Sequence, residues 1–127
     1  MRVLKFIFIT VISLISYSFT TQDSTSTKSP EPVKGLASFY ANKFNGRKTS
    51  SGQIFSNNGL TAAHKHLKFG TKVMVRNLKN DSTVIVTIND RLPQKSKRTI
   101  DLTTKAAKQL NFIKSGLAKV EITILES

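Results

Sequence analysis

The hydrophobic pattern of the chain predicts short β-strands from residue 35 to residue 125. Residues 72–77 alternate between polar and apolar side chains, as expected of a strand with one buried face. Residues 83–88 are all β-branched, and residues 118–125 alternate around Val120, Ile122 and Ile124, so both segments also favour strands. With the shorter apolar runs included, the predicted strands cover residues 35–40, 61–63, 72–77, 83–89, 100–102 and 118–125.

One short helix and several turns are predicted between these strands. Thr103 is a residue type that caps helices, and residues 105–110 form the body of a helix that ends before Gly116. Residues 79–82 predict a turn, and residues 42–58, rich in Gly, Asn, Ser and Thr, predict an ordered loop with little regular structure. Short, closely spaced strands with one or two short helices indicate an all-β fold, and they favour a small closed barrel.

The first 34 residues differ in pattern from the rest. Residues 1–20 combine a basic start, Arg2 and Lys5, with an apolar run and a more polar end, which is typical of a secretory signal peptide. An uncleaved N-terminal anchor is the alternative, although the apolar run is shorter than the roughly 20 residues of a membrane span. Residues 21–34, rich in Ser, Thr, Pro and Lys, predict a disordered linker, so we expect the folded domain at residues 35–127.

The charge balance and the absence of cysteine narrow the class of protein. The chain carries 20 Lys and Arg residues against 7 acidic ones, a net charge of +13, and such a surface attracts polyanions. Nucleic acid, anionic lipid and acidic cell-wall polymers all meet that description. Because there is no cysteine, we expect no disulfide, no thiolate metal site and no lipoprotein anchor. The expected product is an exported protein with no stable membrane span after processing.

Carboxylate chemistry in the predicted domain has few candidates. Asp90 ends an apolar strand just before Arg91 and a proline-containing loop. A carboxylate at the mouth of a barrel is partly removed from water, so its pKa can rise and make it a general acid. The structural alternative is an aspartate that caps a turn and pairs with Arg91. Asp101 is open to a similar structural interpretation, as a partner of the following helix N-terminus or of nearby backbone amides.

The two histidines and two aromatic residues are further candidates. His64 and His66 are two residues apart, which places both on one face of a strand. No nearby pattern supplies a third ligand, so we expect no metal site and no cofactor. The favoured interpretation is a neutral His64 hydrogen-bonded to a carboxylate or a sugar hydroxyl, with His66 facing solvent. Tyr40 and Phe44 could form a stacking platform for sugar rings or belong to the core.

A set of short motifs follows in a fixed order along the predicted domain. They are residues 35–40 (GLASFY), 44–52 (FNGRKTSSG), 61–64 (TAAH), 67–71 (LKFGT), 75–77 (VRN), 89–91 (NDR) with Pro93, 98–103 (RTIDLT), and Ala106, Ala107 and Leu110. No single motif is decisive. In this order and spacing, the set resembles the rare lipoprotein A family over essentially the whole domain.

The resemblance implies a six-stranded double-psi β-barrel and a lytic transglycosylase that cleaves peptidoglycan glycan strands, preferably those without stem peptides. The family's functional positions correspond to Gln53, His64 and Asp90, and related barrels make Asp101 a second candidate for the acid. The family usually has Glu where this chain has Gln53, and Leu92 replaces a usual Gly. A catalytic site of Asp90, His64 and Asp101 is therefore expected in a protein of the bacterial periplasm or cell envelope.

The implied reaction needs only one carboxyl group. An acid, here Asp90, protonates the glycosidic oxygen, the C6 hydroxyl of the muramyl sugar attacks C1, and the same carboxylate accepts the hydroxyl proton to leave a 1,6-anhydro end. His64 would orient this acid or the substrate. We expect Gln53, Tyr40, Thr61 and Arg91 to bind the glycan.

Two other classes of function are consistent with the sequence. A non-catalytic glycan-binding or wall-loosening module would keep the binding surface without the chemistry, and Gln53 in place of Glu favours it. A secreted nucleic-acid or anionic-lipid binder rests on charge alone, because the chain carries no nucleic-acid recognition motif. We therefore expect peptidoglycan glycan strands as the partner, no nucleic acid, and a monomer.

Overall fold

The computed structural model describes residue 13, residues 15–18 and residues 30–127. Most of the predicted signal peptide, residues 1–20, and of the predicted linker, residues 21–34, therefore lies outside the described residues. Within the described part, no helix is both long enough and apolar enough to cross a membrane.

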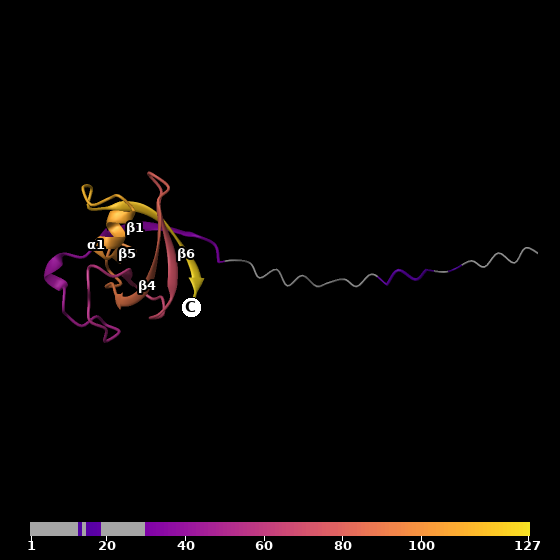
Figure 1. Cartoon of the computed structure of the whole chain (residues 1–127), viewed down its shortest axis with the longest axis horizontal. Helices are drawn as coiled ribbons and strands as arrows, with labels where there is room; N and C mark the ends of the chain where they lie inside the picture. The colour runs from indigo at the N-terminus through magenta and orange to yellow at the C-terminus, as the bar shows by residue number, and fades with distance from the viewer. Residues whose placement is uncertain (1–12, 14, 19–29) are drawn as a thin grey trace, which may run out of the picture.

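Six strands and two short helical segments make up the folded domain (Figure 1). In chain order they are β1 (Val33–Phe39), the 3₁₀ turn η1 (Asn42–Phe44), β2 (Thr61–His64), β3 (Lys72–Asn77), β4 (Thr83–Arg91), β5 (Ile100–Leu102), α1 (Thr104–Gln109) and β6 (Ala118–Glu126). Each strand overlaps one of the runs predicted from the hydrophobic pattern. Between η1 and β2, the predicted ordered loop has a single isolated bridge, Lys48 to Ile54.

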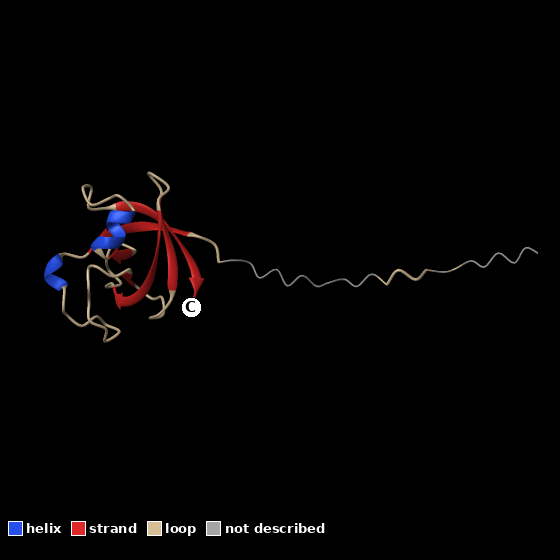
Figure 2. Cartoon of the chain, viewed as in Figure 1, coloured by secondary structure: helices blue, strands red, loops and turns tan. Residues whose placement is uncertain are grey.

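The strands, red in Figure 2, close into a barrel. Their order around it is β1-β5-β2-β4-β3-β6. Two of the six neighbouring pairs, β1 with β5 and β2 with β4, are parallel, and the other four are antiparallel. The all-β prediction and the six-stranded closed barrel are therefore confirmed. Closure leaves no unpaired sheet edge, which suits a domain of this size.

Several element boundaries differ from the sequence prediction by one or two residues, and two of them differ because pairing continues past the predicted ends. Val33 pairs with Ile122 and Lys34 pairs with Glu121, so these two residues belong to β1 and not to the predicted linker. At the other boundary, β4 runs on to Arg91 because its parallel pairing with β2 continues there. Cross-strand pairing of this kind is set by tertiary contacts that a local hydrophobic pattern does not contain.

The interior of the barrel is apolar, and α1 packs against it. Ile88, Ile100 and Leu102 in the strands are fully buried. Ala106 in α1 and Leu110 directly after it are fully buried as well. Thr103 caps α1 as predicted, since its hydroxyl accepts a hydrogen bond from the Ala106 amide. The helix thereby fixes the chain that leaves β5.

A close approach of two chain segments positions the start of β5. A side chain at Gly35 would bring its Cβ within 2.4 Å of the Thr99 hydroxyl oxygen, so only glycine fits there. The Leu36 amide donates to the Thr99 hydroxyl, at 3.3 Å, and the Thr99 amide donates to the Leu36 carbonyl, at 2.8 Å. These contacts tie the segment before Asp101 to β1.

Candidate active site

Asp90 lies on the outer face of the barrel because of a bulge in β4. Ala62 pairs with the buried Ile88, but the next residue of β2, Ala63, pairs with Asp90, so Asn89 is an extra residue. Paired residues share a face and successive residues alternate between faces. Without the bulge, Asp90 would have the same orientation as Ile88 and point into the core. The bulge instead puts Asp90 on the face of Ala63, which pairs on its other side with Asp101.

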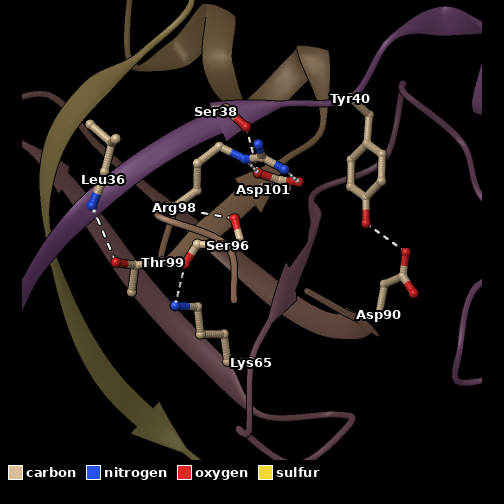
Figure 3. Close-up of polar contacts among 9 residues, drawn as sticks. All are labelled: Leu36, Ser38, Tyr40, Lys65, Asp90, Ser96, Arg98, Thr99 and Asp101. Atoms are coloured by element: carbon tan, nitrogen blue, oxygen red, sulfur yellow. Dashed lines mark hydrogen bonds and ion pairs between the residues drawn. The ribbon is translucent and has the colours of Figure 1, made fainter. Parts of the chain in front are cut away.

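Neutral donors hold both oxygens of the Asp90 carboxylate. The Tyr40 hydroxyl donates to Oδ2 at 2.6 Å (Figure 3), and the Ser50 and Arg91 amides each donate to Oδ1 at 2.9 Å. The Arg91 guanidinium donates instead to the carbonyl oxygens of His64 and Asp90 and lies 4.2 Å from the centre of the Phe69 ring. The alternative in which Asp90 pairs with the Arg91 side chain is therefore wrong, and only the Arg91 amide contacts the carboxylate.

These contacts lower the pKa of Asp90 instead of raising it. Burial raises the pKa of Asp90, as expected from the sequence. Hydrogen bonds from Tyr40, Ser50 and Arg91 together outweigh burial and bring this pKa below 3.8. The expectation of a raised pKa is thus wrong for the unliganded protein, in which Asp90 is ionised at neutral pH. Burial and the Asp90 carboxylate raise the pKa of Tyr40 far above 10, so the phenol keeps its proton.

The loop before β2 folds back over the end of β4 and brings Gln53 to the site. The Ser51 amide donates to the Asn89 carbonyl at 3.3 Å, and the Asn89 side-chain amide donates to Gln53 Oε1 at 3.1 Å. Gly52, with φ at +86°, makes the turn that allows both contacts. Gln53 is exposed, so the fold places an accessible amide next to the residue that precedes Asp90.

Asp101 shares the outer face with Asp90 but is tied to a counter-charge. Arg98 Nε donates to Oδ1 at 2.8 Å and Arg98 Nη2 donates to Oδ2 at 3.1 Å (Figure 3). The Ser38 hydroxyl also donates to Oδ1. The Asp101 side chain is only 13% exposed. Its predicted structural role as a partner of the helix N-terminus is replaced by this bidentate ion pair.

Tyr40 belongs to a small aromatic cluster at the end of β1. Its ring centre lies 4.5 Å from that of Phe55 and 5.9 Å from that of Phe44, which it meets edge-on. The cationic groups of Lys43 and Arg47 lie over the Phe44 ring, at 5.3 and 5.4 Å from its centre. This packing fixes the Tyr40 ring against the loop, so its hydroxyl is aimed at Asp90.

His64 is directed to the opposite face of the sheet from Asp90. It follows Ala63 in β2 and pairs with the buried Ile100, and it lines a cavity with Ile122 and Ile124. Its Nδ1 accepts hydrogen bonds from the backbone amides of His66 and Leu67, both at 3.2 Å. The structure therefore does not bring His64 to the Asp90 carboxylate.

Burial keeps His64 uncharged. Burial, together with the charges of His66, Arg91 and Lys65, lowers the pKa of His64 to about 4. The neutral form was expected, but its partners are backbone amides and not a carboxylate. His66 is exposed as predicted, and no group of three potential metal ligands occurs among the described residues.

Several groups that contribute to the site were not predicted from the sequence. The Ser50 amide and the Asn89 side chain carry no signal beyond their place in polar or apolar runs, because their roles depend on the loop folding back. Ser38 could have been found, since it lies two residues before Tyr40 in β1 and so shares its face. Thr61 shares the face of Ala63 by the same period, on the side expected to bind substrate.

Comparisons with known proteins agree with this fold. Residues 33–122 match the sequence model of the family described as "Lytic transglycolase". The chain is 44% identical over 116 residues to the endolytic peptidoglycan transglycosylase RlpA of Pasteurella multocida, covering 91% of this chain and 38% of that protein. A probable endolytic peptidoglycan transglycosylase RlpA of Treponema pallidum is 51% identical over 89 residues, 70% of this chain and 28% of that protein. The chain thus spans about two fifths or less of these relatives.

A solved structure with the same architecture is the Streptomyces papain inhibitor. It has a TM-score of 0.63 at 17% identity and covers 78% of this chain and 98% of that chain. A Clavibacter michiganensis expansin mutant in complex with cellohexaose has a TM-score of 0.61 at 16% identity, over 76% and 51% of the two chains. At such low identities the likeness establishes the fold, the double-psi β-barrel, and says nothing about activity.

Proposed function

The chain belongs to the lytic transglycolase family, and from this premise we propose that it is an endolytic peptidoglycan transglycosylase with Asp90 as its acid/base. Its substrate would be the glycan strand of the bacterial cell wall, preferably a strand without stem peptides. The observation that supports this role best is a half-buried carboxylate on the outer face of the barrel, held by neutral donors alone. No fixed cation has to be displaced before Asp90 can take up or release a proton.

The proposed reaction uses Asp90 twice. In its protonated form Asp90 gives its proton to the glycosidic oxygen, and the bond from that oxygen to C1 of the muramyl sugar breaks. The C6 hydroxyl oxygen of the same sugar then bonds to C1, and its proton passes to the Asp90 carboxylate. The products are a 1,6-anhydro end and a new free hydroxyl, and no water is consumed.

Substrate binding supplies the protonated form of Asp90 in this proposal. In the free protein, burial already raises the pKa of this group, and the hydrogen bonds of Tyr40, Ser50 and Arg91 lower it. A sugar ring laid over the exposed side of Asp90 adds to the burial and so moves its pKa upward. Tyr40 then acts as a positioning residue that holds Asp90 Oδ2 by a hydrogen bond.

The remaining candidate residues receive substrate-binding or positioning roles. Gln53 is accessible beside the end of β4, where its amide would bind the N-acetyl group of the substrate. Thr61 would contact the sugar on the face of Ala63, and Arg91 would border the site from its place over Phe69. We assign His64 to positioning the chain after β2, because it accepts two backbone amide bonds on the other face. Asp101 remains the second candidate for the acid.

Action on the cell wall requires export, which the predicted signal peptide at residues 1–20 would provide. After cleavage, the domain would work in the periplasm or cell envelope as a monomer, without a cofactor and without nucleic acid as a partner. The part of the predicted linker outside β1, residues 21–32, would precede the barrel.

Product analysis of purified sacculi tests the proposed activity. Wild-type protein should release fragments that end in 1,6-anhydromuramyl groups, which mass spectrometry distinguishes from hydrolytic reducing ends by the missing water. Asp90→Asn should release none above background while it keeps the wild-type circular dichroism spectrum. Hydrolytic ends, or anhydro ends from Asp90→Asn at the wild-type rate, would contradict the proposal.

A non-catalytic glycan-binding module is the second candidate, and two observations favour it. Gln53 replaces the Glu that is usual in the family and cannot hold a charge, and Asp90 is ionised in the free protein. The same sacculus experiment separates the two functions. Tight binding to sacculi with no fragments at any pH would support the binding module.

A further inference from the structure

A second polar site lies beside Asp90 but does not contain it. Between η1 and α1, the structure has a cavity of about 430 Å³ whose lining includes Asn42, Asn45, Asn57, Lys105 and Lys108. We refer to these five residues as the Asn–Lys pocket. Figure 2 shows the two helical segments that border it as neighbours at one side of the barrel.

The buried Asn57 fixes the orientation of the two other asparagines. Asn57 is 4% exposed, and its backbone amide donates to Asn45 Oδ1 at 2.7 Å. Its side-chain amide donates to Asn42 Oδ1 at 2.8 Å. Because these bonds use the carbonyl oxygens, the Nδ2 groups of Asn42 and Asn45 take no part in them and can donate to a ligand. The sequence predicted residues 42–58, which contain these asparagines, only as an ordered loop.

Two lysines add positive charge without a matching acid. Lys105 and Lys108 are three residues apart on α1, where side chains are neighbours, and both are exposed. Neither makes an ion pair with an acidic residue among residues 30–127. Like charges at this spacing repel each other and weaken a helix. The pocket is therefore rich in donors and carries two uncompensated positive charges.

Tyr40 connects this pocket to Asp90. The Tyr40 carbonyl accepts hydrogen bonds from the Asn57 side chain, at 3.2 Å, and from the Thr104 hydroxyl, at 3.3 Å. The hydroxyl of the same tyrosine donates to Asp90. The pocket and the proposed acid thus lie at the two ends of one tyrosine, as neighbouring subsites along an extended ligand would.

We propose that the Asn–Lys pocket binds a carboxylate-bearing N-acetyl sugar of the glycan, a muramic acid residue whose lactyl carboxylate is free. This inference rests on the proposed function, which supplies the glycan as ligand. Lys105 and Lys108 bind the carboxylate, and the amides of Asn42 and Asn45 donate to hydroxyl or acetyl oxygens. A muramic acid that carries a peptide has its carboxylate converted into an amide and loses this interaction. Lys105 and Lys108 are then specificity-determining residues.

Steady-state cleavage of two glycans tests the pocket. One substrate is peptide-free glycan with free carboxylates, and the other is the same glycan with its carboxylates converted to methylamides. For Lys105→Gln/Lys108→Gln, KM on the free-carboxylate glycan should rise about tenfold with kcat unchanged, as expected for two partly exposed charge contacts. KM on the amidated glycan should stay at the wild-type value. An equal rise on both substrates, or no rise on either, would overturn the proposal.

A matched control variant distinguishes binding in the Asn–Lys pocket from a general effect of net charge. Lys114→Gln/Lys119→Gln removes the same charge from two exposed lysines that line a different cavity, with Asn77 and Leu117. It should leave both KM values unchanged. An equal effect of this variant would mean that net charge, and not the pocket, attracts the glycan.

A binding measurement tests the Asn–Lys pocket independently of lytic activity. Isothermal titration of the full chain with N-acetylmuramic acid and with N-acetylglucosamine should show binding of the first only, and Lys105→Gln/Lys108→Gln should abolish it. Inorganic phosphate is the competitor. If phosphate competes as well as the sugar acid, the site is a general anion site and the proposal fails. Binding of the sugar acid without cleavage of any glycan would overturn the proposed function alone.

Discussion

Asp90 and Asp101 lie on the same outer face of the barrel, next to the same residue of β2, yet their surroundings differ. Ala63 pairs with both of them. Asp101 receives two hydrogen bonds from the Arg98 guanidinium, whereas the groups that donate to Asp90 are neutral. Proton transfer at Asp101 would require its ion pair with Arg98 to break, whereas no ion pair holds Asp90. The difference favours Asp90 over Asp101 for the proposed proton transfer.

His64 extends the comparison to the other face. It is one residue from Ala63, but the alternation of β2 directs it away from both aspartates and toward the barrel interior. Its low pKa reflects burial first and neighbouring positive charge second. Three titratable groups on β2 or paired with it thus have three different physical states. Asp90 is an ionised carboxylate without a counter-charge, Asp101 is an ion-paired carboxylate and His64 is a neutral imidazole.

The largest expected effect separates the two aspartates by activity. Asp90→Asn should reduce the rate of anhydro-end formation by about 10²–10⁴, the usual contribution of a general acid. Asp101→Asn should reduce the rate less than about tenfold, since it removes an ion pair and no proton donor. Initial rates on peptide-free glycan, with melting temperatures to verify folding, provide the comparison. A larger loss for Asp101→Asn would transfer the acid role to that residue.

The next effect concerns the pH dependence of stability on the His64 face. The unfolded histidine takes up a proton near pH 6.5 and the folded one only near pH 4, so His64 stabilises the fold above pH 6.5 and this contribution is lost as the pH falls toward 4. A pKa near 4 instead of 6.5 corresponds to about 3 kcal/mol of unfolding free energy. Urea unfolding at pH 7 and pH 4 should show a decrease of this size.

Two variants isolate His64 in that measurement. His64→Gln keeps a carbonyl acceptor for the backbone amides and should remove most of the decrease between pH 6.5 and 4. His66→Gln, at the exposed neighbour, should keep it. Asp90 interferes little, because its pKa is lowered from 3.8 and the stability that it contributes is lost mainly as the pH falls below that value. A decrease that survives His64→Gln would locate the proton uptake elsewhere.

A second carboxylate near Asp90 should have a smaller effect on activity. Gln53→Glu keeps the acceptor for the Asn89 side chain and adds a negative charge beside the end of β4. That charge raises the pKa of Asp90, because like charges disfavour ionisation, and it stabilises positive charge in the transition state. We expect a rate increase of about tenfold at neutral pH. An unchanged or lower rate would indicate that one carboxylate suffices here.

The smallest expected effect is a shift of the Asp90 titration. Tyr40→Phe removes one of the hydrogen bonds that lower the pKa of Asp90, so this pKa should rise. Carboxyl carbon chemical shifts followed by NMR from pH 2 to 6 would measure it. Because the reaction begins with protonated Asp90, the limb of the rate profile on which activity falls with rising pH should move to higher pH with it. A pKa that falls or stays in place would remove Tyr40 from its positioning role.

The sequence alone determined the elements and the candidate groups. The two-residue period of residues 72–77 and 118–125 and the β-branched run at residues 83–88 fixed the strands, because one buried face requires that alternation. Thr103 marked the start of the helix by its capping chemistry. The ordered motifs indicated the family, and the scarcity of acidic residues limited the candidates to a few aspartates.

Only the tertiary structure decided which of these groups can act. The face of Asp90 depends on one extra residue, Asn89, in the pairing of β4 with β2, and a shift of a single residue reverses the face of a strand side chain. The pKa of Asp90 depends on donors 40 and 50 positions away, at Ser50 and Tyr40. Burial and hydrogen-bond partners of this kind exist only when distant segments meet, so a local pattern could name the carboxylate but could not determine its protonation state.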